Sequence, residues 1–549
     1  MVEKRHAGAF RTHCNIQTVS QVLGDASALD ALYHHSKTAT CLKDTRMKIR
    51  EDITTWMSQT NSSAICWVNG PAGVGKSCIA RTIAEESQEG GKLAASFFFD
   101  DSKEALTTAE RLFPTIAYQI ARARPKILTS LSMLQNALQE DYHITKQRKS
   151  DQVDELIIKP LERQQQESSP YPRVVIIDSL DECKDDKETM MNVIAQISRL
   201  TQALRAPECI PLRFLITSRH EQLIQDCFSG IPGHSSTDPT YRSVTLDTQD
   251  SKVDVGIFLR HHLAPYLSDD QMEWLIGESD GLFIHASTAQ KFILDPDNFM
   301  PKRNFELIKK QPAIVWKGTP LDHLYTKIVS TSRYPEKNSL TRWIVETILL
   351  LFDPLPLGEI QHLLVLEQDT GKFALQKLHS VLNIPDQGDK PVDVYHSSFR
   401  AFMLSNDRPI DYHVDLLVRH ARIAESCLIL VVASNGNAKM TDRDVKEFRT
   451  AFKYACRFWS KHLAESSFDQ SLAEAVQRFE KKALYYWLEA LIRLEDIANA
   501  IASLGRAMKW LKVCRPCWSH RYHSDFVLPL RLGTCPASGR LQRAARFVP

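Results

Sequence analysis

Residues 70–77 read Gly70-Pro71-Ala72-Gly73-Val74-Gly75-Lys76-Ser77, which fills the phosphate-loop pattern GxxxxGK[ST]. An apolar run from Ala64 to Val68 precedes this stretch and a helical pattern beginning at Cys78 follows it, so strand, loop and helix stand in the required order. In such a loop, backbone amides turn toward phosphate oxygens, Lys76 neutralises the β and γ charges, and the Ser77 hydroxyl ligates Mg²⁺. The stretch therefore predicts a nucleoside triphosphate site on an α/β fold.

A second strand supplies an acid for the metal. Val174 to Ile177 are four consecutive β-formers without alternation, which is typical of a central parallel strand covered on both faces. This run ends in Asp178, and ligands bind at the carboxyl ends of parallel strands. We therefore expect Asp178 to hold Mg²⁺ together with Ser77.

Two further acids, Asp181 and Glu182, follow Asp178 after one short turn. Both lie close enough to orient or deprotonate an attacking water, and Glu182 is the better candidate for the general base. The alternative is that both acids simply begin the next helix, where negative charge favours the helix dipole. The sequence leaves these two interpretations open.

A third strand is predicted over Leu212 to Arg219, and Arg219 stands at its polar end. A planar, permanently charged guanidinium at this edge of the sheet could reach a γ-phosphate and report whether it is present. The alternative for Arg219 is a solvated arginine in a loop.

These three blocks together resemble the NACHT-type nucleotide-binding domain of the STAND class of P-loop NTPases, particularly the fungal NOD-like receptor proteins. The Walker motifs alone are common to P-loop proteins, and their order with later blocks carries the resemblance over roughly residues 41 to 505. The further blocks are Cys41 to Arg46, Phe97 to Phe99, Phe113 to Ile120, Gly281 to Ala286, Leu321 to Tyr325, Asp393 to Arg400 and Tyr454 to Trp459.

The resemblance implies that ATP or ADP is bound with Mg²⁺, and it adds site residues outside the Walker motifs. Thr45 and Arg46 belong to the segment that leads into the nucleotide domain, and Cys78 continues the phosphate loop. His396 occupies the position implied to contact a diphosphate, although a lone histidine is also often an ordinary packed residue. Phe283 stands where plant relatives carry a proline, at a position implied to touch the adenine.

The fold class expected is an α/β P-loop NTPase domain, with a parallel sheet and flanking helices, followed by helical lid, winged-helix and α-helical domains. The forty residues ahead of the nucleotide domain are too few for a sizeable core, so the chain resembles the central switch of a longer receptor. The expected divisions are an N-terminal linker with short helices (1–60), the NACHT domain (61–248), the lid (249–310), the winged helix (311–412), the α-helical domain (413–510) and a basic, disordered tail (511–549).

Composition and charge narrow the classes of binding partner that we expect. The net charge of +2 over 549 residues gives no overall electrostatic reason to expect nucleic acid or a membrane surface. A DNA-reading helix needs a cluster of Lys and Arg, and residues 357–364 of the expected winged helix contain neither. The twelve cysteines are scattered, no signal peptide is recognisable and the apolar runs are too short for a bilayer, so we expect a cytoplasmic protein without a transmembrane segment.

The function that the sequence favours is a signal-transduction switch, of the kind that the resemblance associates with innate immunity. ADP would hold the winged helix and lid against the nucleotide domain, whereas ATP would favour an open form that self-associates into a homo-oligomer and engages an effector or ligand protein. Slow ATP hydrolysis would reset the switch. Alternatives are an AAA+-like motor with continuous turnover, or a scaffold with permanently bound nucleotide. ATP is favoured over GTP by the resemblance and because no NKxD motif is present.

Overall fold

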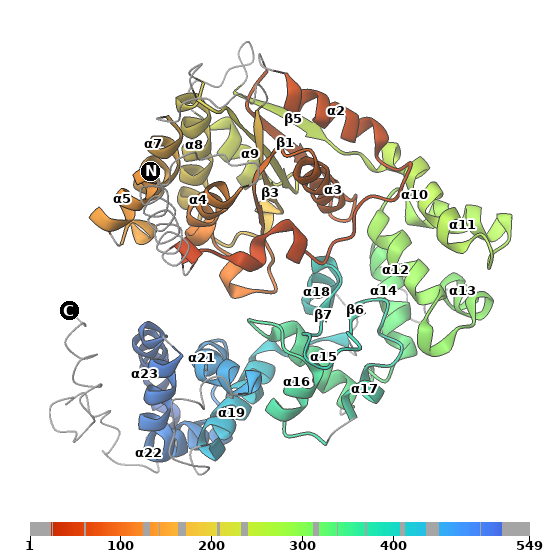
Figure 1. The fold of residues 1–549 in the computed structure, drawn as a ribbon. Helices are drawn as coiled ribbons and strands as arrows, with labels where there is room; N and C mark the ends of the chain where they lie inside the picture. The colour runs from red at the N-terminus through yellow and green to blue at the C-terminus, as the bar shows by residue number, and fades with distance from the viewer. Residues whose placement is uncertain are drawn as a thin grey trace, which may run out of the picture. The chain divides into compact units, whose positions relative to one another are not determined.

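The chain folds into two compact units (Figure 1). The first comprises residues 1–419 and 447–455, and the second comprises 420–446 and 456–549. The computed structural model describes residues 23–24, 26–59, 62–123, 132–141, 143–162, 172–205, 209–231, 240–310, 318–336, 339–367, 370–406, 412–434, 449–494 and 496–518. The candidate site lies in the first unit.

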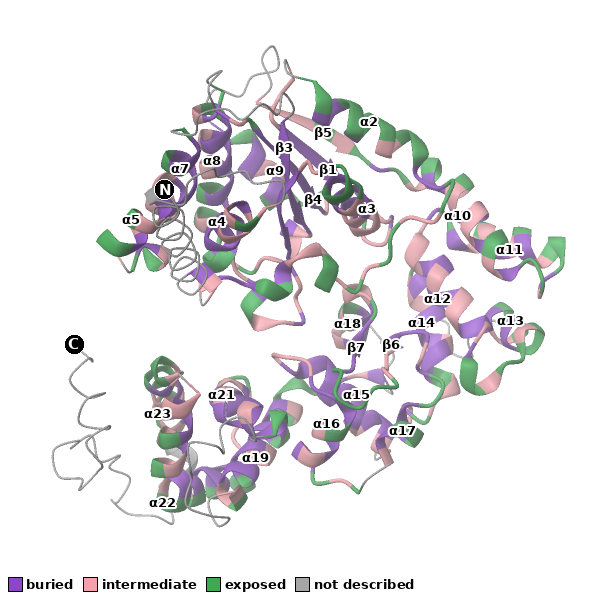
Figure 2. Cartoon of the chain, viewed as in Figure 1, coloured by how far each residue is buried: buried purple, intermediate pink, exposed green. Residues whose placement is uncertain are grey.

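A five-stranded parallel sheet forms the centre of the nucleotide domain, as the sequence predicts. Its strands stand in the order β2-β3-β4-β1-β5. Every residue of the first four strands is buried, which matches their uninterrupted apolar runs (Figure 2). The bounds are β1 Ile65–Asn69, β2 Leu93–Phe98, β3 Arg173–Asp178, β4 Leu212–Ser218 and β5 Tyr241–Thr245.

Helices cover both faces of this sheet. Alternate residues of β3 enter two separate buried clusters, with Ile176 in one and Ile177 in the other, because successive side chains of a strand point to opposite faces. The helix α2 (Met47–Ser58) lies in the predicted N-terminal linker with short helices, and it buries Trp56 in the cluster that contains Ile176. The other described α-helices of the domain are α3 Lys76–Glu89, α4 Leu112–Arg122, α5 Ser132–Glu140, α6 Lys149–Val153, α7 Lys159–Glu162, α8 Lys187–Ala203 and α9 Gln222–Ser229.

A run of helices follows β5 within the same unit. The predicted lid (residues 249–310) corresponds to four helices, for which we keep that name: α10 Thr248–Leu263, α11 Asp269–Ser279, α12 Phe283–Ile293 and α13 Pro301–Lys309. The predicted winged-helix region (residues 311–412) keeps that name here and contains α14 Pro320–Thr331, α15 Leu340–Leu350, α16 Leu357–Leu363, α17 Thr370–Leu375, the antiparallel pair β6 Leu382–Asn383 and β7 Asp393–Val394, and α18 Ser397–Leu404. The multidomain arrangement of an α/β NTPase domain followed by helical domains is therefore confirmed.

The second unit is helical around buried Trp459 and Trp487. The C-terminal helices are α19 Leu416–Ser434, α21 Thr450–Ala464, α22 Gln470–Arg493 and α23 Ile497–Trp518. Because α23 continues to Trp518, regular structure extends past residue 511, where the sequence placed the start of a disordered tail. Residues 519–549 lie outside the described residues. Among the described helices, none combines the length and the apolar character that crossing a bilayer requires.

Candidate nucleotide-binding site

The phosphate loop connects β1 to α3 with a backbone that only glycine adopts readily. Gly73 and Gly75 have φ of +79° and +94°, and α3 begins at the next residue, Lys76. A Cβ on Gly73 would lie 2.0 Å from Cγ2 of Ile284, which belongs to lid helix α12. The Ile284 backbone N–H also donates to the Gly73 carbonyl at 3.1 Å. The loop is therefore shaped to leave amides at a helix N-terminus free for an anion and to accept close contact from the lid.

Lys76 folds back across its own loop. Its Nζ donates to the carbonyls of Gly70 at 2.9 Å and Pro71 at 2.8 Å. Burial lowers the pKa of this ammonium, while the nearby carboxylates of Asp181 and Asp178 act in the opposite direction. A buried cation with nearby acids and only neutral carbonyl acceptors is well placed to pair with phosphate oxygens.

Asp178 and Ser77 are brought together at the end of β3. Because β4 lies between β1 and β3, Thr217 of β4 separates the two loops, and its hydroxyl donates to Asp178 Oδ1. The Ser179 hydroxyl donates to Asp178 Oδ2 at 3.1 Å and lies 3.4 Å from the Ser77 hydroxyl. Burial raises the pKa of Asp178, against hydrogen bonds from Thr217, Ser77 and Ser179. The carboxylate and hydroxyl oxygens are the donor set that Mg²⁺ prefers, so Ser77 and Asp178 could hold that ion.

Asp181 is occupied by Arg219. Its Oδ2 lies 3.0 Å from Arg219 Nε, and its Oδ1 accepts the Arg219 backbone N–H at 2.9 Å. The guanidinium of Arg219 also donates through Nη2 to the Ser397 hydroxyl of α18 at 3.4 Å. Arg219 is therefore not a freely solvated loop residue: it connects the end of β4 to the winged-helix region.

Glu182 lies in a different environment. It ends the 3₁₀ turn Leu180–Glu182, and its Oε2 accepts the Asp101 backbone N–H at 3.1 Å. Burial raises the pKa of Glu182 well above its usual range, and the carboxylates of Asp101 and Asp100 add to this effect. Because Arg219 binds the Asp181 carboxylate, the geometry favours Glu182 over Asp181 as the candidate general base.

Asp181 and Glu182 do not begin the next α-helix, although they lie in a short 3₁₀ turn. The next helix, α8, begins at Lys187, and its N-cap is Asp186, whose side chain accepts the Thr189 N–H. Asp181 and Glu182 precede this cap and belong to the 3₁₀ turn.

His396 forms the N-cap of α18 and lines the same cavity. Its Nδ1 accepts the backbone N–H of Ser398 at 3.1 Å. Burial lowers the pKa of the imidazole to about 4, and the positive charges of Arg219 and Lys76 contribute. Because Nδ1 accepts a backbone proton, the neutral ring carries its own proton on Nε2. His396 is thus a neutral hydrogen-bond donor close to the cations of the phosphate site.

Thr45 and Arg46 belong to the segment that leads into the nucleotide domain, and Arg46 contacts the phosphate loop. Arg46 donates through Nη2 to the Val74 carbonyl and to the Ser251 hydroxyl of α10 at 2.7 Å, and its guanidinium lies 5.0 Å from the ring centre of Phe283. Thr45 is buried and donates its hydroxyl to the Leu42 carbonyl at 2.7 Å. Both residues line the cavity, and Arg46 Nη2 also joins the phosphate loop to α10.

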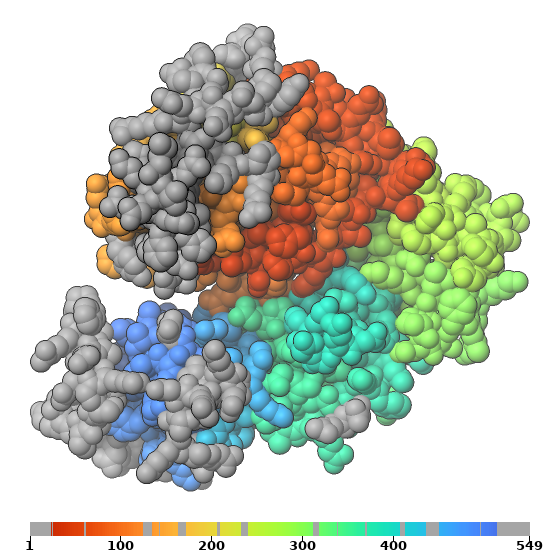
Figure 3. Space-filling model, in the orientation of Figure 1, coloured from red at the N-terminus to blue at the C-terminus, as the bar shows by residue number. Residues whose placement is uncertain are grey.

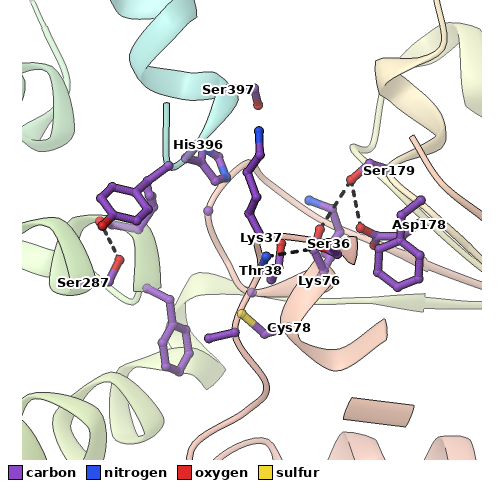
Figure 4. A pocket seen from close by; sticks show the side chains of 18 of the residues that line it. Ser36, Lys37, Thr38, Lys76, Cys78, Asp178, Ser179, Ser287, His396 and Ser397 are labelled. Carbon is purple, nitrogen blue, oxygen red and sulfur yellow. Dashed lines mark hydrogen bonds between the residues drawn. The ribbon is translucent and has the colours of Figure 1, made fainter. Parts of the chain in front are cut away.

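One cavity of about 670 Å³ unites these residues, a volume suited to a small-molecule ligand (Figure 4). The predicted residues that line it are Thr45, Arg46, Ala72, Gly73, Gly75, Lys76, Ser77, Cys78, Asp178, Asp181, Glu182, Arg219 and His396. Three predicted residues do not line it. Gly70 and Pro71 offer their carbonyls to Lys76, and Val74 is buried in the core beneath the loop. Burial raises the pKa of Cys78 to about 12, so its thiol is neutral.

The cavity also contains residues that the sequence analysis missed. Asp100 and Asp101 follow the end of β2 after one intervening residue, Phe99, so the rule that identified Asp178 at the end of β3 also points to them. Lys37, Lys291 and Asp393 carry no such local signal, because they come from segments far apart in the chain.

Comparisons with known proteins find one family model and several solved structures that are similar to parts of this chain. Residues 46–219 match the family model described as "Nephrocystin 3, N-terminal". A comparison with curated proteins gives no match. The family match thus covers the nucleotide domain from the start of α2 to the end of β4, and not the lid or the winged-helix region.

Three solved structures illustrate the likeness. A STAND protein with a tetratricopeptide-repeat sensor from Pyrococcus horikoshii is 12% identical, with a TM-score of 0.38, over 87% of this chain and 66% of that one. A Walker-type ATPase of Pyrococcus abyssi is 12% identical, with a TM-score of 0.31, over 66% of this chain and 98% of that one. The ORC2 protein of Aeropyrum pernix, in ADPNP-ADP complexes, is 10% identical, with a TM-score of 0.32, over 66% of this chain and 94% of that one. These values are too low to transfer an activity or a partner.

Proposed function

We propose that this protein is a nucleotide-dependent signal-transduction switch of the STAND class, with a NACHT-type domain and a NOD-like receptor mode of action. The observation that carries this proposal is that the phosphate loop and His396 line one cavity. The lid also contacts the loop, through Ile284 on Gly73 and Phe283 under Arg46. A nucleotide in this cavity would therefore touch the nucleotide domain, the lid and the winged helix at once. The number of phosphates in the nucleotide would then bias the closure of these parts.

The proposed closed form matches the contacts of Arg219 and His396. With ADP, the Nε2–H of His396 would donate to the diphosphate, and Arg219 would keep its contact with Ser397. With ATP, Arg219 would exchange the Ser397 hydroxyl for a γ-phosphate oxygen, because a charged acceptor binds a guanidinium more strongly than a hydroxyl does. The winged-helix region would then lose its contact with the end of β4, which favours the open, self-associating form.

Hydrolysis would return the switch to its closed form. Ser77 and Asp178 would hold Mg²⁺, Lys76 would neutralise the phosphates, and Glu182 would accept a proton from the attacking water. We propose slow turnover because Arg219, the permanent cation at the γ-phosphate end, is held by Asp181 rather than left free for transition-state charge. The cytoplasmic location stays a prediction.

The nucleotide bound to the purified protein and its turnover rate test this function. We expect ADP to co-purify and ATP hydrolysis to run well below about 1 s⁻¹, the lower end of ordinary enzyme rates. Turnover at or above that rate without a change of oligomeric state would instead support a motor. Nucleotide that neither exchanges nor turns over would support a scaffold.

Acid should open the nucleotide-free closed form. The pKa of His396 is lowered to about 4 from an ordinary value of 6.5, so the closed form binds its proton less well than an open form with a solvated ring. The neutral His396 ring therefore contributes its full stabilisation of the closed form above about pH 6.5. As the pH drops toward 4, the equilibrium constant for closure falls by up to about tenfold for each pH unit.

Small-angle scattering of nucleotide-stripped protein at pH 7.5 and pH 5.5 measures this effect. The radius of gyration should rise at the lower pH in the wild type and stay constant in His396→Gln, whose side chain is neutral at both values. Equal expansion of the two proteins would show that another group controls the opening.

A further inference from the structure

Residues 36–43, here named the strap, precede the nucleotide domain in the sequence. All eight of them line the cavity. The strap is attached to α3 at two points. Arg81 Nη1 donates to the carbonyls of Ser36 at 2.6 Å and Thr38 at 2.5 Å, and the Cys41 N–H donates to the Thr82 hydroxyl at 2.9 Å. The strap is therefore a fixed part of the nucleotide domain.

Lys37 extends from the strap to the winged-helix region. Its ammonium forms an ion pair with Asp393 of β7, whose side chain is only 2% exposed. Figure 4 shows the Lys37 side chain directed toward Ser397 and His396. Asp393 also accepts the Ser102 hydroxyl at 2.8 Å, so it joins the loop after β2 as well. In the space-filling view, N-terminal residues in red border winged-helix residues in teal (Figure 3).

The short segment from Asp393 to His396 is thus bound both by the strap and by lid helix α12. Asp393 lies three residues before His396 and is bound by Lys37. Tyr395, the residue directly before His396, receives Lys291 of lid helix α12, whose Nζ lies 2.9 Å from the centre of the ring. The lid and the strap therefore each contribute one lysine to the position of this segment.

Lys37 and Asp393 each have a second charged partner, Lys37 in the nucleotide domain and Asp393 in the winged-helix region. Lys37 Nζ lies 3.7 Å from Asp100 of the nucleotide domain. Asp393 lies 3.7 Å from Nη2 of Arg400, in α18 of the winged-helix region. If the winged helix moved away, neither charge would lose all its partners, so the desolvation cost that normally opposes breaking a buried ion pair would be reduced. A pair arranged in this way can open and close.

We propose that Lys37 is a latch, in which its ion pair with Asp393 keeps the winged helix, and with it His396, closed over the nucleotide. The strap then becomes an autoinhibitory element that links the chain ahead of the nucleotide domain to the winged helix. This inference rests on the proposed switch function, because the latch has a role only if closure controls nucleotide release.

A double-mutant cycle of Lys37→Ala and Asp393→Asn tests the latch. Either change should speed the release of a fluorescent ADP roughly tenfold or more, since a charge-assisted contact contributes about that factor. The double variant should release ADP no faster than the faster single variant, because both changes remove one interaction. Lys48→Ala, an exposed lysine on α2, is the matched control and should behave as the wild type.

Hydrogen exchange of the α18 amides, measured without nucleotide, is the second readout. We expect faster exchange of these amides in Lys37→Ala and in Asp393→Asn, with unchanged exchange in the core strand β3. Wild-type ADP release and wild-type exchange in Lys37→Ala would overturn the latch, while ADP binding itself would still support the nucleotide switch. If the wild type bound no nucleotide, the proposed function would fail, and the exchange experiment alone would decide whether Lys37 closes the winged helix.

Discussion

Replacing Lys76 with alanine should abolish tight nucleotide binding. The lysine side chain is 9% exposed and contributes the positive charge at the closed end of the phosphate loop, where backbone amides contribute only partial charges. Losing charge-assisted contacts to two phosphates removes about 3 kcal/mol or more, which is roughly a hundredfold in affinity. In the variant, the carbonyls of Gly70 and Pro71 also lose their donor, and Asp178 and Asp181 lose a neighbouring cation.

Isothermal titration with ADP and Mg²⁺ measures this loss, and a thermal melt shows whether the variant is folded. Lys48→Ala again controls for removing a lysine from the surface. A folded Lys76→Ala protein with wild-type ADP affinity would contradict the assignment of residues 70–77 as a phosphate loop.

Replacing Glu182 with glutamine should preserve ATP binding and remove most hydrolysis. A general base contributes about a hundredfold or more to the rate, and an amide of the same shape cannot accept the proton. The amide oxygen can still accept the Asp101 N–H. The change also removes a negative charge beside Asp100 and Asp101, so the variant should be at least as stable as the wild type.

Binding and single-turnover hydrolysis measured on one preparation decide the assignment. Asp178→Asn is the contrasting variant, since it should weaken Mg²⁺-dependent ATP binding rather than the chemical step alone. Asp181→Asn should loosen Arg219, whose Nε and backbone N–H bind its carboxylate. If hydrolysis survived in Glu182→Gln and failed in Asp181→Asn, the base would be Asp181. Survival in both would leave neither carboxylate as the base.

The sequence predicted the parts of the fold that depend on local patterns. The apolar runs of β1, β3 and β4 correspond to fully buried strands, and the loop glycines take the positive φ that the phosphate-loop pattern requires. Asp178 could be placed because the carboxyl end of a parallel strand is a fixed position in such a sheet. These predictions need only neighbouring residues and the rule of parallel packing.

The contacts between distant segments could not be predicted in this way. Lys37 and Asp393 are 356 positions apart, and although Asp393 begins one of the blocks that carry the resemblance, that block gives no sign of a partner at Lys37. The contacts of Arg46 with the Val74 carbonyl and with Ser251 of α10 could not be predicted for a similar reason, because Ser251 lies 205 positions away in the chain. Such pairings depend on how the lid and the winged helix pack. Local sequence patterns do not reveal that packing.

The molar mass of the protein in its two nucleotide states tests the switch most directly. Light scattering of Glu182→Gln at one protein concentration, first with ADP and Mg²⁺ and then with ATP and Mg²⁺, separates binding from hydrolysis. We predict a monomer with ADP and a larger, self-associated species with ATP. The same mass in both nucleotides, with binding of each confirmed on the same sample, would contradict the central claim that the γ-phosphate controls assembly.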